Sequence, residues 1–104
     1  MPHAAIYRRR GAEPDEKKLL VTAIKRAMIE VLKVPEDNHP VRLNEYEADA
    51  FLIPEGCSDS FTLIEATLFA GRTPKTKKAF LQAVVKRMGE LGVAAEDVRV
   101  VIYD

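Results

Sequence analysis

A repeat at a spacing of sixty residues is the feature that most constrains how this chain can fold. Gly11 and Pro14 recur sixty positions later as Gly71 and Pro74. Apolar stripes of unrelated helices can resemble one another, but a glycine and a proline outside the stripe do not follow from helical periodicity. The sequence therefore predicts two similar units fused head to tail. The match includes further identical residues: Lys17, Lys18, Ala23, Met28 and Glu30 fall on Lys77, Lys78, Ala83, Met88 and Glu90.

The second unit reads as strand, helix and strand. Residues 61–70 are apolar at both odd and even positions, which is typical of a strand covered on both faces. Gly71 ends that strand, and Thr73 and Pro74 suit the N-cap and first position of a helix. Gly92 then closes the helix, and residues 97–103 are rich in β-branched side chains. We expect a β-α-β unit.

The first unit follows the same plan with weaker boundaries. Residues 2–9 predict a strand, a helix should run from Pro14 to about Lys33, and residues 41–46 predict a second strand. The apolar run 50–53 suggests a hairpin arm or an extension along a sheet edge. We expect one domain of 104 residues, with unit one at about 2–53, a linker at 54–60 and unit two at about 61–104.

The charge balance and the single cysteine narrow the function classes. Sixteen basic and sixteen acidic residues cancel, which argues against a nucleic-acid binder driven by bulk electrostatics. No apolar run approaches the roughly 18 residues of a membrane span, so no membrane partner is expected. Cys57 has no cysteine to pair with, and no secretory signal is visible, so a cytoplasmic location is expected. Of the three arginines Arg8 to Arg10, at least two read as a solvated strand end.

Metal and cofactor signatures are weak. His3 and His39 are the only histidines, and they are too scattered to predict a metal site. No phosphate-binding or dinucleotide-binding glycine pattern is present. We therefore expect neither a metal nor a cofactor.

Pro2 is the residue with the most distinctive possible reactivity. Once Met1 is removed, Pro2 presents a secondary amine on a rigid ring. An ordinary α-amino group titrates at about 7.7–8.0. Burial and neighbouring cations would lower that pKa, which would give a base usable at neutral pH.

Together with the repeat, four short stretches resemble the tautomerase superfamily, and most closely its fused two-unit branch that includes malonate semialdehyde decarboxylase. They are Pro2, Lys33–Glu36 (KVPE), Phe69–Arg72 (FAGR) and Asp97–Val100 (DVRV). The resemblance implies an α+β fold: two fused β-α-β units with pseudo-twofold symmetry, and a four-stranded mixed sheet with two helices on one face. It also implies a homotrimer.

The resemblance assigns roles to particular residues. Pro2 would be the catalytic base and acid, and Arg72, just after the turn glycine, would bind a substrate carboxylate; the first unit has Ala12 in its place. An arginine early in the strand after the helix matches both Arg42 and Arg99, and Arg42 suits the site better. The loop aspartate of the decarboxylase branch falls near Asp37, although Asn38 is the ungapped match. A neighbour's Phe51 could replace the family's aromatic C-terminal hairpin.

The implied activity is keto–enol proton transfer on a small 2-keto or unsaturated carboxylic acid. Decarboxylase or hydratase activity stays open, although Ala70 stands where the decarboxylase branch has a second arginine. Two alternatives also stay open: a catalytically silent tautomerase fold, and a ferredoxin-like small-molecule binding or interaction module. Sheet order separates these, because ferredoxin-like sheets interleave the strands of the two units.

The repeat also predicts geometry. A pseudo-twofold axis would make the two first strands antiparallel, centred on Ile6 and Ala66, and would set Pro2 opposite Ala70. Arg72 would then lie roughly 7 Å further along and could fold back toward Pro2. A sheet that is apolar on both faces with helices on one should bury its other face between subunits. Leu63, Thr67 and Phe69, or their alternates, are expected there.

Overall fold

The computed structural model describes residues 2–36, 40–69 and 71–104. Two β-α-β units follow one another, each closed by a strand that returns beside its own first strand. A short 3₁₀ turn follows the second strand, and another precedes the last strand. The elements are β1 (His3–Arg9), α1 (Pro14–Leu32), β2 (Val41–Tyr46), η1 (Ala48–Ala50), β3 (Thr62–Thr67), α2 (Pro74–Glu90), η2 (Ala95–Asp97) and β4 (Val98–Tyr103).

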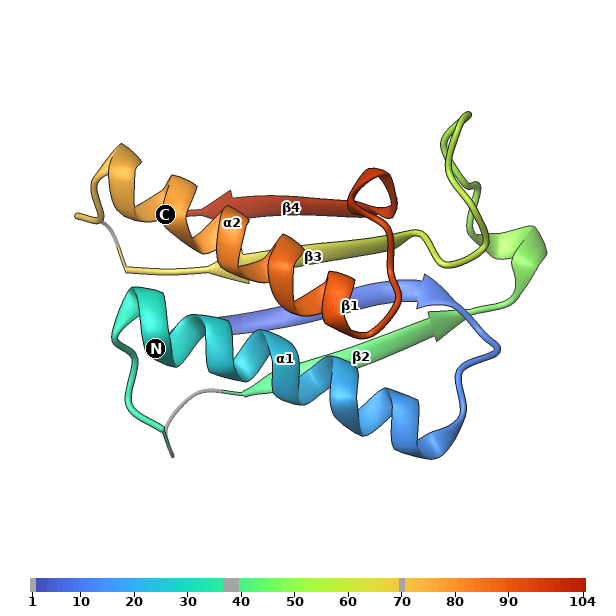
Figure 1. Ribbon diagram of the computed structural model, residues 1–104, viewed down its shortest axis with the longest axis horizontal. Coiled ribbons are helices and arrows are strands. Elements are labelled where there is room, and N and C mark those ends of the chain that lie inside the picture. The colour runs from blue at the N-terminus through green and yellow to red at the C-terminus, as the bar shows by residue number, and fades with distance from the viewer. Residues whose placement is uncertain (1, 37–39, 70) are drawn as a thin grey trace.

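The four strands form one mixed sheet in the order β2-β1-β3-β4. β1 pairs in parallel with β2, β3 pairs in parallel with β4, and the two units join through antiparallel β1 and β3. Both helices cover the same face and run in opposite directions (Figure 1). Each strand thus pairs within its own unit, which confirms the expected fold class and rules out the interleaved ferredoxin-like alternative.

The register at the join differs from the expected one by two residues. Ile6 lies opposite Ile64, and Ala5 lies opposite Glu65, whereas the strand centres had predicted Ile6 opposite Ala66. A slip of two keeps every side chain on its expected face, because side chains alternate with a period of two. The alternation of apolar residues therefore predicts which side chains share a face, but it does not determine which residues of β1 and β3 are paired.

The core lies between the helices and one face of the sheet. Ala4, Ile6 and Ile64 are fully buried on that face, and Phe80 of α2 is fully buried above them. The opposite face carries the alternate residues of each strand, with Tyr103 half exposed at its edge. Complete burial of side chains as large as Phe80 stabilises the helix layer by roughly 1.5–3 kcal/mol each.

The helices begin and end where the sequence indicated. Pro14 and Pro74 occupy the first helical positions, and the Thr73 hydroxyl accepts a hydrogen bond from the Thr76 backbone N–H at 3.1 Å. α1 ends at Leu32, and Lys33 turns the chain away in a left-handed conformation, φ 58°. The C-terminal end of α1 and the N-terminal end of α2 matter because they lie beside the candidate site.

The run 50–53 is not the strand-like arm that its apolarity suggested. Ala50 ends η1, residues 51–53 are irregular, and Phe51 joins a row of rings on the open face of the sheet. Ring centroids in this row, Tyr7–Tyr46–Phe51–Phe61, are 6.3, 5.6 and 6.1 Å apart. Aromatic packing, in place of strand pairing, therefore accounts for the apolar residue in this segment.

Arg8 also departs from the expected pattern of a solvated strand end. Its position on the face of Ala4 and Ile6 leaves it only 4 % exposed. Arg10 has a side chain 60 % exposed, as expected, and that of Arg9 is 22 % exposed. Among the described residues, no helix is long and apolar enough to cross a membrane.

Candidate functional site

Pro2 and Arg72 lie at the same end of the sheet. β1 begins at His3 and β3 ends at Thr67, and these two residues are paired. Pro2 precedes the one strand and Arg72 follows the other. Continuing the register places Pro2, which is buried, opposite Leu68. Arg72 then stands four residues beyond the level of Pro2, whereas the expected register had placed it two residues beyond. Ala70, the expected partner of Pro2, lies outside the described residues.

Arg72 is held between the end of β3 and the end of α1. Its guanidinium donates to the Phe69 carbonyl at 3.1 Å and to the Leu32 carbonyl at 3.2 Å. The Leu32 carbonyl is one of those at the helix C-terminus that have no partner within the helix. The negative end of the helix dipole favours a cation at this place. The first unit's helix thus positions the arginine of the second unit.

Arg42 and Arg99 lie on the open face, and they are not equivalent positions. Arg42 is paired with Ala5, whereas Arg99 is paired with Leu63. The residue that occupies the place of Arg42 in the second unit is Val101, opposite Glu65. The expectation that both arginines match one position is therefore wrong, because the strands β2 and β4 are offset.

The two arginines also have different surroundings. The guanidinium carbon of Arg99 stands 5.4 Å from the centre of the Phe61 ring, toward the end of the sheet remote from Pro2. Arg42 stands nearer the Pro2 end, at the level of Ala5. Arg42 is therefore the better placed of the two for a site at Pro2.

Phe51 lies at the end of the sheet away from Pro2. Its carbonyl accepts a hydrogen bond from Arg9 Nε at 2.9 Å, and Arg9 is the last residue of β1. Phe51 therefore does not join Pro2 within one chain, and its contribution from a neighbouring subunit stays a prediction. Asp37, with Asn38 and His39, lies outside the described residues.

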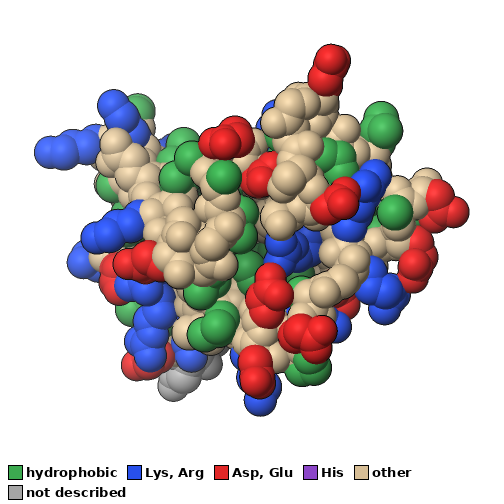
Figure 2. Space-filling model, turned by 45° about the vertical axis from the view of Figure 1, so that its right-hand side comes forward, with side chains coloured by type: hydrophobic (Ala, Val, Ile, Leu, Met, Phe, Trp, Pro, Cys, Tyr) green, Lys and Arg blue, Asp and Glu red, His purple; other side chains and the backbone are tan. Residues whose placement is uncertain are grey.

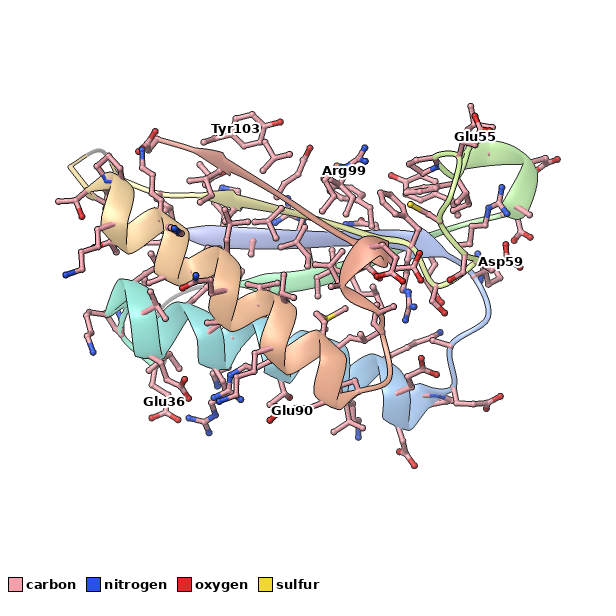
Figure 3. The ribbon with its side chains drawn as sticks, turned by 45° about the horizontal axis from the view of Figure 1, so that its top comes forward. Glu36, Glu55, Asp59, Glu90, Arg99 and Tyr103 are labelled. Carbon is pink, nitrogen blue, oxygen red and sulfur yellow. The ribbon has the colours of Figure 1, made fainter. Side chains whose placement is uncertain are left out.

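Glu65 is a feature that the sequence reasoning passed over. It lies on the open face, where the Tyr103 hydroxyl donates to its carboxylate at 3.3 Å. The Glu65 charge raises the pKa of Tyr103 above its ordinary value, and burial followed by the Glu65 charge raises the pKa of Tyr7. Figure 3 shows Tyr103 and Arg99 on the side of the sheet away from the helices. The sequence feature that could have identified Glu65 is its place as an acidic residue in the middle of an apolar strand.

Among the described residues, no group of three histidine, cysteine or acidic side chains is arranged to hold a metal ion. Two groups with useful chemistry lie at the Pro2 end of the sheet: Pro2, a buried residue, and the Arg72 guanidinium. An amine can exchange a proton with a substrate, and a guanidinium can hold a carboxylate with two parallel hydrogen bonds.

Comparison with known proteins addresses the fold and the family. A model of a tautomerase enzyme family matches residues 38–104. The structure of FG41 malonate semialdehyde decarboxylase inhibited by 3-bromopropiolate superposes with a TM-score of 0.89, with 23 % identity over 97 % of this chain and 81 % of that chain. A fused 4-OT wild-type symmetric trimer gives a TM-score of 0.85, with 28 % identity over 98 % of this chain and 84 % of that chain.

A third similar structure is N1, a member of the cis-3-chloroacrylic acid dehalogenase family. Its TM-score is 0.85, with 20 % identity over 97 % of this chain and 73 % of that chain. These likenesses confirm the fold, and the match of the family model over more than half of the chain decides the family. The chain belongs to the tautomerase enzyme family.

Proposed function

We propose that this chain is a tautomerase-type enzyme acting on a small 2-keto or unsaturated carboxylic acid. Pro2 moves a proton at the carbon next to the carbonyl, and Arg72 holds the substrate carboxylate. The observation that carries this proposal is the antiparallel pairing of β1 with β3, which brings Pro2 and Arg72 to one end of the sheet.

The proposed step is a proton shuttle by one group. The Pro2 nitrogen accepts the enol hydroxyl proton as the carbonyl forms, and the electron pair of the carbon–carbon double bond takes that proton back at carbon. No atom is lost or gained, so no co-reactant is needed. The step requires Pro2 as a free secondary amine, which requires removal of Met1. A cation close to the amine, which is the role proposed for Arg72 in the substrate complex, favours the neutral amine over its protonated form.

Arg72 suits the role of carboxylate anchor because its position is fixed by backbone. Two carbonyls, those of Phe69 and Leu32, hold its guanidinium without a carboxylate partner in these contacts. Among the described residues these two contacts are to neutral carbonyls, so the guanidinium keeps a positive charge to attract an anionic substrate.

We further propose that the site is completed by subunit contacts in a homotrimer. The fused 4-OT proteins of similar fold form trimers. The open face of this sheet carries the aromatic row with Tyr7 and, on the edge strand β4, the half-exposed Tyr103; Phe69, which follows β3, is also exposed. A neighbour's Phe51 and an Arg42 on this face would then reach the site.

The test is the enol-to-keto conversion of phenylpyruvate with four matched proteins. Pro2→Ala should lower kcat/KM by about 10²–10⁴-fold, because it removes the ring amine. Arg72→Ala should lower it by about tenfold or more, with most of the change in KM. Arg87→Ala, which removes an arginine of α2 on the helix side of the sheet, should match the wild type.

Unchanged rates for both Pro2→Ala and Arg72→Ala would overturn the assignment. Absence of activity in a folded wild type with free Pro2, across phenylpyruvate and related 2-keto acids, would instead favour a catalytically silent tautomerase fold.

A further inference from the structure

A cavity with a volume of about 270 Å³ lies at the end of the sheet away from Pro2. Figure 2 turns this end of the molecule forward and shows basic and acidic side chains interspersed over it. The cavity is lined by Arg8, Arg9, Arg10, Gly11, Ala12, Glu16, Asp59 and Ser60.

This cavity is the repeat equivalent of the Pro2 end. The sixty-residue repeat relates Gly11 to Gly71 and Ala12 to Arg72. The same shift relates Thr62 to Pro2, and Thr62 is fully buried. The cavity therefore occupies the position in the other unit that corresponds to the proposed active site. It lacks a free amine, because Thr62 lies inside the chain and its nitrogen is part of a peptide bond.

The cavity has its own cation in Arg8. This side chain is almost fully buried, between its sheet neighbours Glu45 and Thr62. The structure shows its guanidinium donating to the Ser60 carbonyl at 3.2 Å and to a Glu16 carboxylate oxygen at 3.5 Å. Both contacts are longer than the 2.7–2.9 Å typical of a charge-assisted hydrogen bond.

Four acidic residues lie near Arg8. Asp97 is buried, and both of its carboxylate oxygens accept hydrogen bonds from Ser58. These hydrogen bonds, with a smaller contribution from the charge of Arg8, lower the pKa of Asp97.

Glu45 is held by Lys17, whose Nζ lies 2.8 Å from its carboxylate, and this contact lowers the pKa of Glu45. The Glu16 side chain is 46 % exposed, and that of Asp59, paired with Arg9, is 91 % exposed. Exposed ion pairs of this kind contribute little, so Glu16 and Asp59 can turn into solvent at small cost.

We propose that this cavity is a second, non-catalytic binding site for a small carboxylate, with Arg8 as its buried anchor. A planar carboxylate fits the fork of a guanidinium and would replace the loose Glu16 contact with shorter hydrogen bonds. A volume of about 270 Å³ suits a molecule with a few carbon atoms. The site has no counterpart of the Pro2 amine, so its occupant is bound without being converted.

Malonate is the probe, titrated at constant ionic strength into ¹⁵N-labelled protein and followed by backbone amide shifts. The titration uses the Arg72→Ala protein, so that the proposed active site does not compete for the probe. Saturable shifts are expected at the amides of Gly11, Ala12 and Ser60. Arg8→Gln should weaken binding about tenfold or more. Lys86→Gln, which removes a cation on α2 outside the cavity lining, should leave the affinity unchanged.

A second pair of variants keeps the test valid if Arg8→Gln does not fold. Glu16→Gln and Asp59→Asn remove the internal carboxylates that compete with malonate, so each should tighten binding severalfold. Glu36→Gln removes an acid at the other end of the molecule, as Figure 3 shows, and should have no such effect.

The proposal is overturned if the three amides do not shift, or if folded Arg8→Gln binds malonate like its parent protein. It is also overturned if Glu16→Gln and Asp59→Asn tighten binding no more than Glu36→Gln. None of these outcomes depends on Pro2 or on catalysis.

Discussion

Ala5 and Glu65 lie directly opposite each other where β1 meets β3, and the sixty-residue repeat relates the same two residues. A twofold axis that exchanges the two units must therefore pass between them. The two ends of the sheet share a backbone plan, but their chemistry differs. One end carries Pro2 and Arg72, and the other carries Thr62 and Ala12.

Glu65 should control the ionisation of Tyr103 more strongly than that of Tyr7. The charge of Glu65 is the first cause of the raised pKa of Tyr103, whereas burial is the first cause for Tyr7. Glu65→Gln should therefore return the Tyr103 pKa to about its ordinary value and lower that of Tyr7 only in part. ¹³C-tyrosine NMR titration measures both. A Tyr103 pKa that does not move would contradict the contact.

The Ser58–Asp97 contact should make stability depend on pH. The Ser58 hydroxyl and backbone N–H donate to the Asp97 carboxylate at 2.6 and 2.7 Å, and they lower the Asp97 pKa below 3.8. A carboxyl with a lowered folded pKa contributes stability above its unfolded pKa and loses it as the pH falls through the folded value. Ser58→Ala should therefore destabilise the protein at neutral pH and progressively less below about pH 4.

Urea unfolding at several pH values measures this change, with Ser60→Ala as the control on the same loop. A deficit in Ser58→Ala that stays constant down to the most acidic pH would show that the hydrogen bonds act independently of the Asp97 charge.

Thr73 should cap α2. Its hydroxyl accepts the Thr76 backbone N–H at 3.1 Å. Thr73→Ala should lower the free energy of unfolding by about 1 kcal/mol. Thr22→Ala, on an exposed position within α1, is the control and should change it by less than about 0.5 kcal/mol. Equal effects of the two substitutions in chemical denaturation would argue against the cap.

The open face should be the assembly surface. Leu63 lies on it beside Tyr7, and a charge placed there would have to be buried between subunits. Leu63→Asp should shift the protein from trimer to monomer in light scattering. Leu19→Asp, a half-exposed position on α1, should leave the mass unchanged. A wild type that is monomeric at micromolar concentration would contradict the proposed trimer.

The sequence was sufficient to predict the architecture because residues that start helices are clearly placed in it. Pro14, Pro74 and Thr73 mark helix starts that the structure confirms. The register was out of reach, because Ala66 and Ile64 are both apolar and a slip of two leaves the faces unchanged. The expected centre was therefore two residues away from the observed one.

The candidate site was predictable only in part. Pro2 and Arg72 could be brought together from the repeat, but the connection after each helix differs in length, so Arg42 and Arg99 could not be aligned by a fixed shift. Burial of Arg8 was missed because three successive arginines resemble a solvated strand end. Its place on the face of Ala4 and Ile6 was the contrary signal.

The most direct test of the account compares two forms of the same chain that differ only at the Pro2 nitrogen. One form begins at Pro2, as intact mass would verify, and the other keeps one extra residue ahead of it. Exchange of the protons beside the carbonyl of a 2-keto acid is followed by ¹H NMR in D₂O. The account predicts enzyme-dependent exchange by the form with free Pro2, and at least about 10²-fold slower exchange by the blocked form. Equal exchange by both folded forms would contradict the central claim that the Pro2 amine carries the proton.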